Sequence, residues 1–144
     1  LGGTNVDYIS VDPARTAAEQ GRALGLDVLT LVDDAYDAHL LCSGRLLIAG
    51  VLRFGSTFDS QARPGWLCYL GVDDVDAAIS RAVAAGARIL VPSSSSGLNR
   101  YAVLLDPWGT PFGVSAPMDH TEEDDMWVDG PDGRAPLSGL ATIL

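Results

Sequence analysis

The chain contains no lysine, only two cysteines and only two histidines among its 144 residues. Every basic residue is therefore an arginine, and without lysine neither Schiff-base catalysis nor a P-loop phosphate site is available. With 9 basic and 19 acidic residues, the formal net charge is −10. A surface of this charge repels polyanions, so we expect no nucleic acid among the partners.

Long apolar runs are also missing, and no stretch approaches the roughly 18 residues of a membrane span. An export signal has a basic segment followed by an apolar core. The first ten residues, LGGTNVDYIS, show neither feature, so we expect no such signal there. Cys42 and Cys68 each lie in an apolar run, and we expect both to be reduced and buried. These features predict a cytoplasmic protein without a membrane partner.

What the sequence does contain is a weak internal repeat. The segment from Val11 to Gly25 overlays the segment from Val72 to Gly86 at an offset of 61 residues (72 − 11). In each copy a short alternating strand runs into an aspartate that can cap a helix, Ala-rich helical sequence follows, and glycine ends the helix. Asp12 and Asp73 are the matched aspartates, and Pro13 stands where the first turn of a helix tolerates proline.

Each helical segment is followed by three β-rich segments, so the predicted order is β-α-β-β-β twice. Unit one spans residues 4–54 and unit two spans residues 66–117, and together they make one domain over residues 1–118. Residues 55–65 are a polar linker without periodicity, and residues 93–99, SSSSGLN, predict a loop between strands. Residues 119–144 match neither copy and form an acidic C-terminal extension.

The second copy resembles a known family. Its runs VDDVDAA, AAGA, RILVP and RYAVLLDPWGTPFGV resemble the C-terminal βαβββ unit of the vicinal-oxygen-chelate superfamily, especially its glyoxalase and bleomycin-resistance branch. The run VDPARTAAEQ resembles the opening strand and helix less closely, since Glu19 and Gln20 replace the usual Phe-Tyr pair. The resemblance covers residues 4–118. It implies an α+β fold in which two βαβββ units form an open eight-stranded cup around the site, and it implies a homodimer, with the cup built within one chain or across two.

Catalytic members of this superfamily hold a divalent metal with His, Gln or Glu on the first and last strands of each unit. The matching positions here are Asn5 or Val6, Ile48 or a neighbour, Leu67 and Gly113. An ion of this kind needs three or four oxygen or nitrogen ligands, which these positions do not supply. The resemblance therefore implies a domain without a metal or another cofactor. His120 stands in the run HTEEDD, which we interpret as solvated acidic surface.

A cup without a metal binds its ligand by contact area and a few placed polar groups. On the strand over residues 66–71, we expect Leu67 and Tyr69 to face the ligand and Trp66 to pack beneath the helices. Asp7 and His39 are the candidate acid–base groups. The alternative for each candidate is a purely structural role in the core or on the surface. The further candidates for ligand contact are the following side chains: Asn5, Tyr8, Arg53, Arg100, Tyr101 and Trp108.

Two functions remain open at this stage. The first is metal-independent binding of a small, partly aromatic organic molecule, such as an antibiotic or another natural product, for resistance by sequestration. The acidic surface would attract a cationic compound. The second is a metal-independent enzyme of natural-product biosynthesis, a cyclase or isomerase, in which Asp7 or His39 moves a proton. A metal-dependent lyase or dioxygenase is disfavoured.

Overall fold

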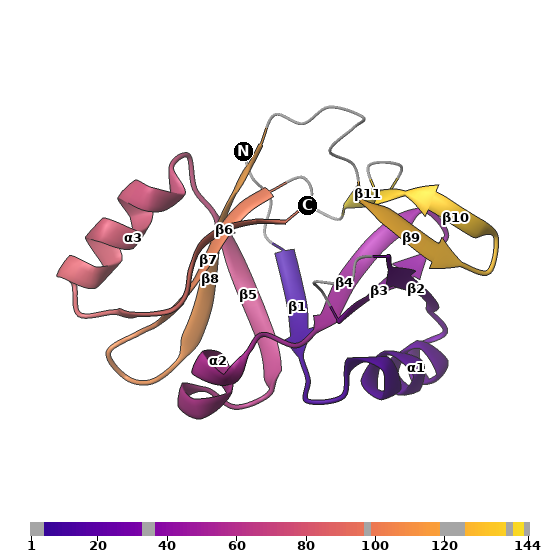
Figure 1. The fold of residues 1–144 in the computed structure, drawn as a ribbon, viewed down its shortest axis with the longest axis horizontal. Coiled ribbons are helices and arrows are strands. Elements are labelled where there is room, and N and C mark those ends of the chain that lie inside the picture. The colour runs from indigo at the N-terminus through magenta and orange to yellow at the C-terminus, as the bar shows by residue number, and fades with distance from the viewer. Residues whose placement is uncertain (1–4, 33–36, 97–98, 119–125, 138–139, 143–144) are drawn as a thin grey trace.

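The computed structural model describes residues 5–32, 37–96, 99–118, 126–137 and 140–142, and its elements follow the expected repeat (Figure 1). Both units have the βαβββ order, so the predicted α+β cup is confirmed. Unit one contains β1 (Asn5–Ile9), α1 (Pro13–Leu24), β2 (Asp27–Leu31), β3 (Ala38–Ser43) and β4 (Leu46–Leu52). Unit two contains β5 (Gly65–Gly71), α3 (Val75–Ala84), β6 (Arg88–Ser96), β7 (Asn99–Leu105) and β8 (Pro111–Pro117).

The strands form one curled sheet in the order β10-β9-β2-β3-β4-β1-β5-β8-β7-β6, with β11 paired to β4. Within each unit the first strand runs parallel to the last, and β1 pairs antiparallel with β5 across the junction of the units. In Figure 1, α3 lies on the left beside the strands of unit two and α1 lies at lower right beneath unit one. The two first strands therefore occupy the centre of the molecule, and a pseudo-two-fold axis passes between them.

Local sequence explains where the helices begin and end. Asp12 accepts a hydrogen bond of 3.2 Å from the Arg15 backbone N–H, and α1 ends at Gly25, whose φ of 67° is left-handed. In unit two the cap is Asp74, which accepts a 2.9 Å hydrogen bond from the Ala77 N–H. The prediction of Asp73 is therefore wrong by one residue, and the helix starts are related by 62 positions (74 − 12) rather than 61.

The C-terminal extension adds three strands, so the sheet has eleven strands rather than the expected eight. These are β9 (Trp127–Gly130), β10 (Gly133–Pro136) and β11 (Ala141–Thr142). Because β9 pairs with β2 and β11 pairs with β4, the extension enlarges the sheet of unit one. His120 lies outside the described residues.

Two segments that were expected to be irregular form regular structure. The linker contains a short helix, α2 (Ser56–Gln61). Ser93 to Ser96, predicted as part of a loop, instead lengthen β6, because their backbone pairs with β7 opposite Asn99, Arg100 and Tyr101. None of the helices in the described parts of the chain has the length and apolarity needed to cross a membrane.

Apolar clusters fill both sides of the sheet. Under α1 the outer face buries Ala17, Leu41, Ala49 and Val51, and under α3 it buries Val75, Ala78, Ala102, Val114 and Ala116. On the concave side of unit two, Phe58 of α2 is 2% exposed and completes the third cluster. The other buried members of that cluster are Ile9, Leu67, Tyr69, Leu90, Val103 and Leu105.

The outer face of β5 corrects two predictions. Alternation along this strand turns Leu67 and Tyr69 inward, as expected, and turns Trp66, Cys68 and Leu70 outward. Cys42 is buried, but Cys68 is exposed. Trp66 is 54% exposed and meets the Tyr8 ring edge-on at 5.1 Å between centroids, so it does not pack beneath the helices. The reason is that α1 and α3 each cover their own unit and leave this central strip uncovered.

Candidate ligand-binding site

A carboxyl group lies where the two units meet. Asp7 of β1 is opposite Gly50 of β4 on one side and opposite Leu67 of β5 on the other. The residue is half-buried, and its carboxylate accepts hydrogen bonds from the Tyr69 hydroxyl and the Gly50 backbone N–H. Burial raises the pKa of Asp7 from 3.8 to about 6, and the two hydrogen bonds limit that rise. Asp7 is therefore a half-buried carboxyl whose pKa is shifted toward neutral pH.

The partner of Asp7 comes from the other unit. Tyr69 of β5 is only 5% exposed. Burial, the charge of Asp7 and the hydrogen bond to Asp7 raise the pKa of Tyr69 well above 10, so the phenol stays protonated and donates. Tyr101 of β7 lies edge-on beside it, with 6.3 Å between ring centroids. The site thus joins a carboxyl of unit one to a phenol of unit two.

Two glycines make room for this pair. Gly50 is opposite Asp7, and Gly113 is opposite Tyr69 at the corresponding place in the parallel pair β5–β8. A Cβ atom at Gly50 would overlap the Asp7 carboxylate, and one at Gly113 would overlap the Tyr69 ring. The structure therefore makes Gly50, rather than Ile48, the counterpart of Gly113, and it makes Asp7 the counterpart of Tyr69.

This donor set does not fit the metal that catalytic relatives use. Among the family's four ligand positions, Gly50 and Gly113 have no side chain and Leu67 is apolar, which leaves Asn5 as the one possible oxygen donor. Asp7 adds a single carboxylate that is already bonded to Tyr69. Within the described ranges, no group of three His, Cys, Asp or Glu side chains is close enough together to hold an ion. Three or four converging ligands would be required.

The structure does not bring His39 to Asp7. His39 of β3 is opposite Val51, on the face that α1 covers, whereas Asp7 is on the concave face. The His39 Nδ1 atom lies 3.2 Å from Thr30 Oγ1, and its Nε2 atom lies 3.7 Å from Asp37 Oδ1. The sheet therefore separates the two candidate acid–base groups.

The remaining predicted contacts divide between the two faces. Leu67, Tyr69 and Tyr101 lie on the concave side, and Asn5 holds the position opposite Tyr69. Tyr8 packs on the outer face, and Arg100 bonds Asp76 of α3 at 2.9 and 3.2 Å.

The last two candidates lie away from the concave strands. Trp108 is 86% exposed and lies in a turn. The Asp106 carboxylate stabilises this turn by accepting a 2.9 Å hydrogen bond from the Trp108 backbone N–H. Arg53 follows the end of β4 and pairs with Asp59 of α2 at 3.4 Å. Neither position is set by strand alternation, so their places could not be predicted from the sequence pattern.

Sequence reasoning missed the apolar lining of unit one. Leu40 is opposite Gly50, Leu29 is opposite Leu40, and all share the face of Asp7. Leu31 and Leu52 continue the same face on β2 and β4, and these four leucines are half-buried. Alternation along the strands was the available signal, but it identifies the concave set only after the strand pairing is known.

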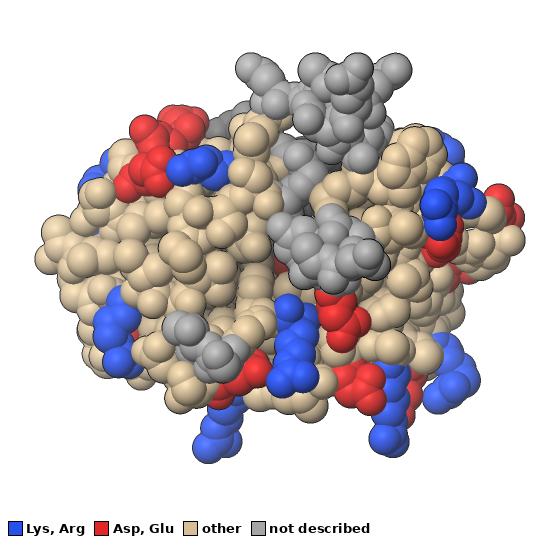
Figure 2. All heavy atoms as spheres, viewed as in Figure 1, with Lys and Arg blue, Asp and Glu red and all other residues tan. Residues whose placement is uncertain are grey.

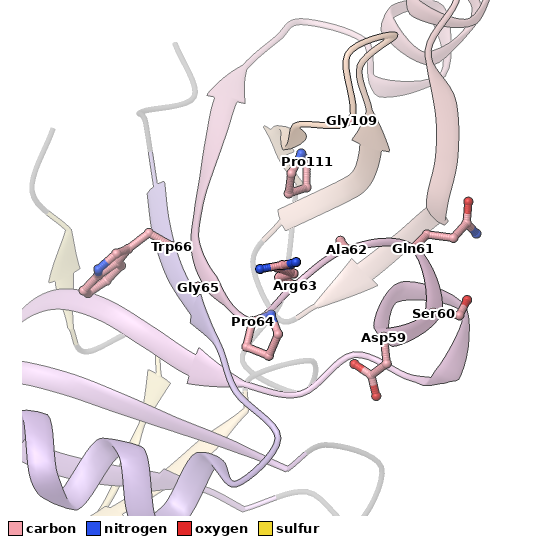
Figure 3. A pocket seen from close by; sticks show the side chains of 10 residues that line it. All are labelled: Asp59, Ser60, Gln61, Ala62, Arg63, Pro64, Gly65, Trp66, Gly109 and Pro111. Carbon is pink, nitrogen blue, oxygen red and sulfur yellow. The ribbon is translucent and has the colours of Figure 1, made fainter.

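A separate hollow of about 590 Å³ opens between the α2–β5 connection and the turn that precedes β8 (Figure 3). Its walls include Asp59, Arg63, Pro64, Gly109 and Pro111, and Figure 3 shows the Trp66 side chain pointing away from the others. The hollow is wide open and does not include Asp7 or Tyr69. We place the candidate site at Asp7 and Tyr69 because that is where a carboxyl with a raised pKa and a convergent donor meet.

Comparison with known proteins identifies the family. A family described as "Glyoxalase-like domain" matches residues 6–115. The protein named "Putative glyoxylase CFP32" from Mycobacterium bovis is 37% identical over 78 residues, which are 51% of this chain and 30% of that protein. The match therefore covers less than a third of the relative's length.

Solved structures show the same fold. The hypothetical protein BH1468 from Bacillus halodurans C-125 superimposes with a TM-score of 0.57 at 14% identity, over 84% of this chain and 99% of that chain. A glyoxalase/bleomycin resistance protein/dioxygenase superfamily member from Vibrio splendidus 12B01 gives a TM-score of 0.51 at 14% identity, over 81% and 98% of the two chains. With the family match over residues 6–115, the chain belongs to the glyoxalase-like domain family of the vicinal-oxygen-chelate superfamily.

Proposed function

We propose that this domain binds a small, partly aromatic organic molecule on its concave face without a metal ion, as a sequestering protein for an antibiotic or another natural product. The observation that carries the proposal is the Asp7–Tyr69 pair, a carboxyl and a phenol that converge at the junction of the units. Small-molecule sites typically combine apolar walls with a few placed polar groups of perturbed pKa. A cytoplasmic homodimer is the setting that we expect for this activity.

The surroundings of the pair support a ligand with an apolar or aromatic body. Tyr69 and Tyr101 present rings on one side, and half-buried leucines of β2, β3 and β4 lie on the other. Aromatic rings can bury large areas and stack on planar molecules. Because Gly50 and Gly113 leave no side chain where relatives place metal ligands, the polar contribution falls to Asp7 and Tyr69.

The test is a binding screen on protein that has been freed of metal by a chelator. A panel of defined aromatic amines, alcohols, carboxylic acids and amides is examined by thermal shift and then by calorimetry. A compound at 100 times its Kd stabilises the fold by about 2.7 kcal/mol, which such an assay detects easily. Compounds that stabilise the wild type should lose most of that effect in Tyr69→Phe.

The matched control is Trp108→Ala, since the Trp108 side chain is 86% exposed on a turn outside the concave face. This variant should bind like the wild type. Binding that appears only after a divalent ion is added would refute the metal-independent proposal. Equal losses in Tyr69→Phe and Trp108→Ala would refute the location.

Acid–base catalysis is the second candidate function, and one observation favours it. The pKa of Asp7, about 6, is close to the value that suits a general base at neutral pH. Tyr69 would assist Asp7, since its protonated hydroxyl can hold the carboxylate in place. This arrangement would serve an isomerase or cyclase that removes a proton next to a carbonyl.

Proton abstraction can be detected without knowing the natural substrate. Simple ketones and thioesters with acidic C–H groups are incubated with the protein in D₂O, and deuterium incorporation is followed by NMR. Exchange above the uncatalysed rate should disappear in Asp7→Asn and persist in Asp73→Asn, which changes an exposed carboxylate on the loop before α3. Exchange that is insensitive to Asp7→Asn would eliminate this candidate.

A further inference from the structure

The two halves of the concave face differ in what covers them. In unit two, α2 lies on the sheet and Phe58 is buried among Leu67, Leu90 and Val103. Phe54 adds a second ring, 5.3 Å from Phe58 between centroids. The chain's own linker therefore occupies this half, and a ligand has no room there without displacing a packed core.

The concave face of unit one has a different lining. Leu29, Leu31 and Leu40, on β2 and β3, are only half-buried and are not among the members of the three apolar clusters, whereas Leu52 of β4 packs against the cluster of unit two. The charged residues at concave positions of β1 to β4, within the described ranges, are Asp7 and Asp27, and both are acidic. Apolar side chains around a carboxylate thus characterise the half that α2 leaves open.

The carboxylate of Asp7 has no cationic partner in the described structure. Its hydrogen-bond donors are the Tyr69 hydroxyl and the Gly50 N–H, both uncharged. Arg53 at the rim is paired with Asp59, Arg100 is paired with Asp76 on the outer face, and His39 lies on the outer face beside Asp37. On the face that Figure 2 shows, the arginines are spread among acidic residues, most of them near the margin and one group in the lower middle.

We propose that the ligand is an organic ammonium with an apolar or aromatic body, bound over unit one with its positive nitrogen on the Asp7 carboxylate. This inference rests on the proposed function and narrows it to one half of the cup and one ligand charge. A charge-assisted hydrogen bond to a partly desolvated carboxylate is stronger than a bond between neutral groups. Tyr69 keeps the carboxylate oriented, and Leu29 and Leu40 contact the apolar body.

The raised pKa of Asp7 agrees with this geometry. Burial disfavours the charged carboxylate, and a bound cation would offset that penalty and lower the pKa. An anionic or neutral ligand would leave the charge uncompensated. The overall net charge of −10 also favours the approach of a cation.

Three probes of nearly equal size separate the possibilities: 2-phenylethylammonium, 2-phenylethanol and phenylacetate. Each is titrated at pH 7.5 into metal-free protein labelled at its Leu and Val methyl groups, and Kd is taken from NMR shifts. We expect the cation to bind about tenfold more tightly than the alcohol, and the anion to bind most weakly. The shifts should centre on Leu29 and Leu40 rather than on Val103 and Leu105.

The variants make the test specific. Asp7→Asn should remove the preference for the cation and leave the alcohol nearly unchanged. Asp73→Asn removes the same unit of charge from an exposed loop, so it should keep the preference. Tyr69→Phe keeps the carboxylate and should reduce the preference only in part.

Each outcome has a clear reading. Equal affinities for the cation and the alcohol, or a preference for the cation that survives Asp7→Asn, would overturn the proposal that the ligand is a cation. Binding of any probe at the concave methyl groups would still support the proposed function. Shifts confined to the methyls of unit two would overturn the location. No shift with any of the three probes would count against both proposals.

Discussion

Asp7→Asn is the perturbation that most directly tests the electrostatics of the site. The substitution keeps the shape of the side chain and its acceptor oxygen for Tyr69, but it removes the negative charge. A carboxyl whose pKa is raised by folding destabilises the native state whenever it is ionised. We therefore expect that the variant is more stable than the wild type at neutral pH, although it loses function.

The magnitude and its pH dependence follow from the two pKa values. The pKa of Asp7 rises from 3.8 to about 6, a difference of roughly 2.2 units, which corresponds to about 3 kcal/mol. Well below pH 3.8 the carboxyl is protonated in both states and costs nothing. Between pH 4 and 6 the folded state retains a proton that the unfolded state releases, so stability falls as pH rises. Above pH 6 the full cost applies.

Two effects reduce the gain that would be measured. Asp7 is half-buried rather than fully buried as a residue, so about 3 kcal/mol is an upper bound. The amide also places an N–H₂ group where the carboxylate accepted hydrogen bonds, which costs about 1 kcal/mol. We expect Asp7→Asn to raise the free energy of unfolding by about 1–2 kcal/mol at pH 8 and to lower it slightly at pH 4.5.

Urea unfolding followed by tryptophan fluorescence at pH 4.5, 6 and 8 provides the measurement. Asp73→Asn is the control for removing one acidic charge, and it should show little pH dependence. A difference between Asp7→Asn and wild type that is the same at pH 4.5 and pH 8 would refute the raised pKa. A higher free energy of unfolding for Asp7→Asn at pH 8 would also mean that Asp7 destabilises the native fold, as expected for a residue that is retained for its function.

Three further predictions concern packing, capping and thiol reactivity. Gly113→Ala should cost about 1–3 kcal/mol in urea unfolding because its Cβ collides with the buried Tyr69 ring, whereas Gly130→Ala meets mainly the mobile end of Leu29 and should cost less. Asp74→Ala should lower stability by about 1 kcal/mol and Asp73→Ala by less than about 0.5 kcal/mol, and the reverse order would contradict the cap assignment. In the native protein a thiol reagent should modify the exposed Cys68 and spare Cys42. Cys42 is buried, and burial raises the pKa of its thiol to about 11. Rapid reaction of both thiols before the protein unfolds would disprove this difference in reactivity.

Sequence patterns were most informative where structure is local. The helix caps at Asp12 and near Asp73, the left-handed Gly25 and the order of strands depend on neighbours a few residues away, and all were predicted to within a residue. The repeat also indicated that the two units are alike. Residues 55–65 were the local exception, because α2 owes its position to the packing of Phe58 on unit two rather than to its own sequence pattern.

The site itself was only partly predictable. Asp7, Tyr69 and Tyr101 were candidates from the sequence, and the structure places them on the concave side. His39 and Arg100 were equally plausible, but the pairing of β3 and β7 with their neighbours turns both to the outer face. Alternation divides the residues of a strand into two sets without saying which set faces inward.

The amino-acid sequence by itself determined that this protein is a duplicated βαβββ domain, and it identified Leu67 and Gly113 as residues that cannot ligate a metal through a side chain, because both follow from short-range pattern and from residue type. Only the tertiary structure decided that Asp7 of one unit meets Tyr69 of the other and that α2 fills one half of the cup. Those contacts join segments about 60 residues apart and depend on the register of β1 against β5. Register is set by the packing of the whole sheet, so no local stretch of sequence encodes it.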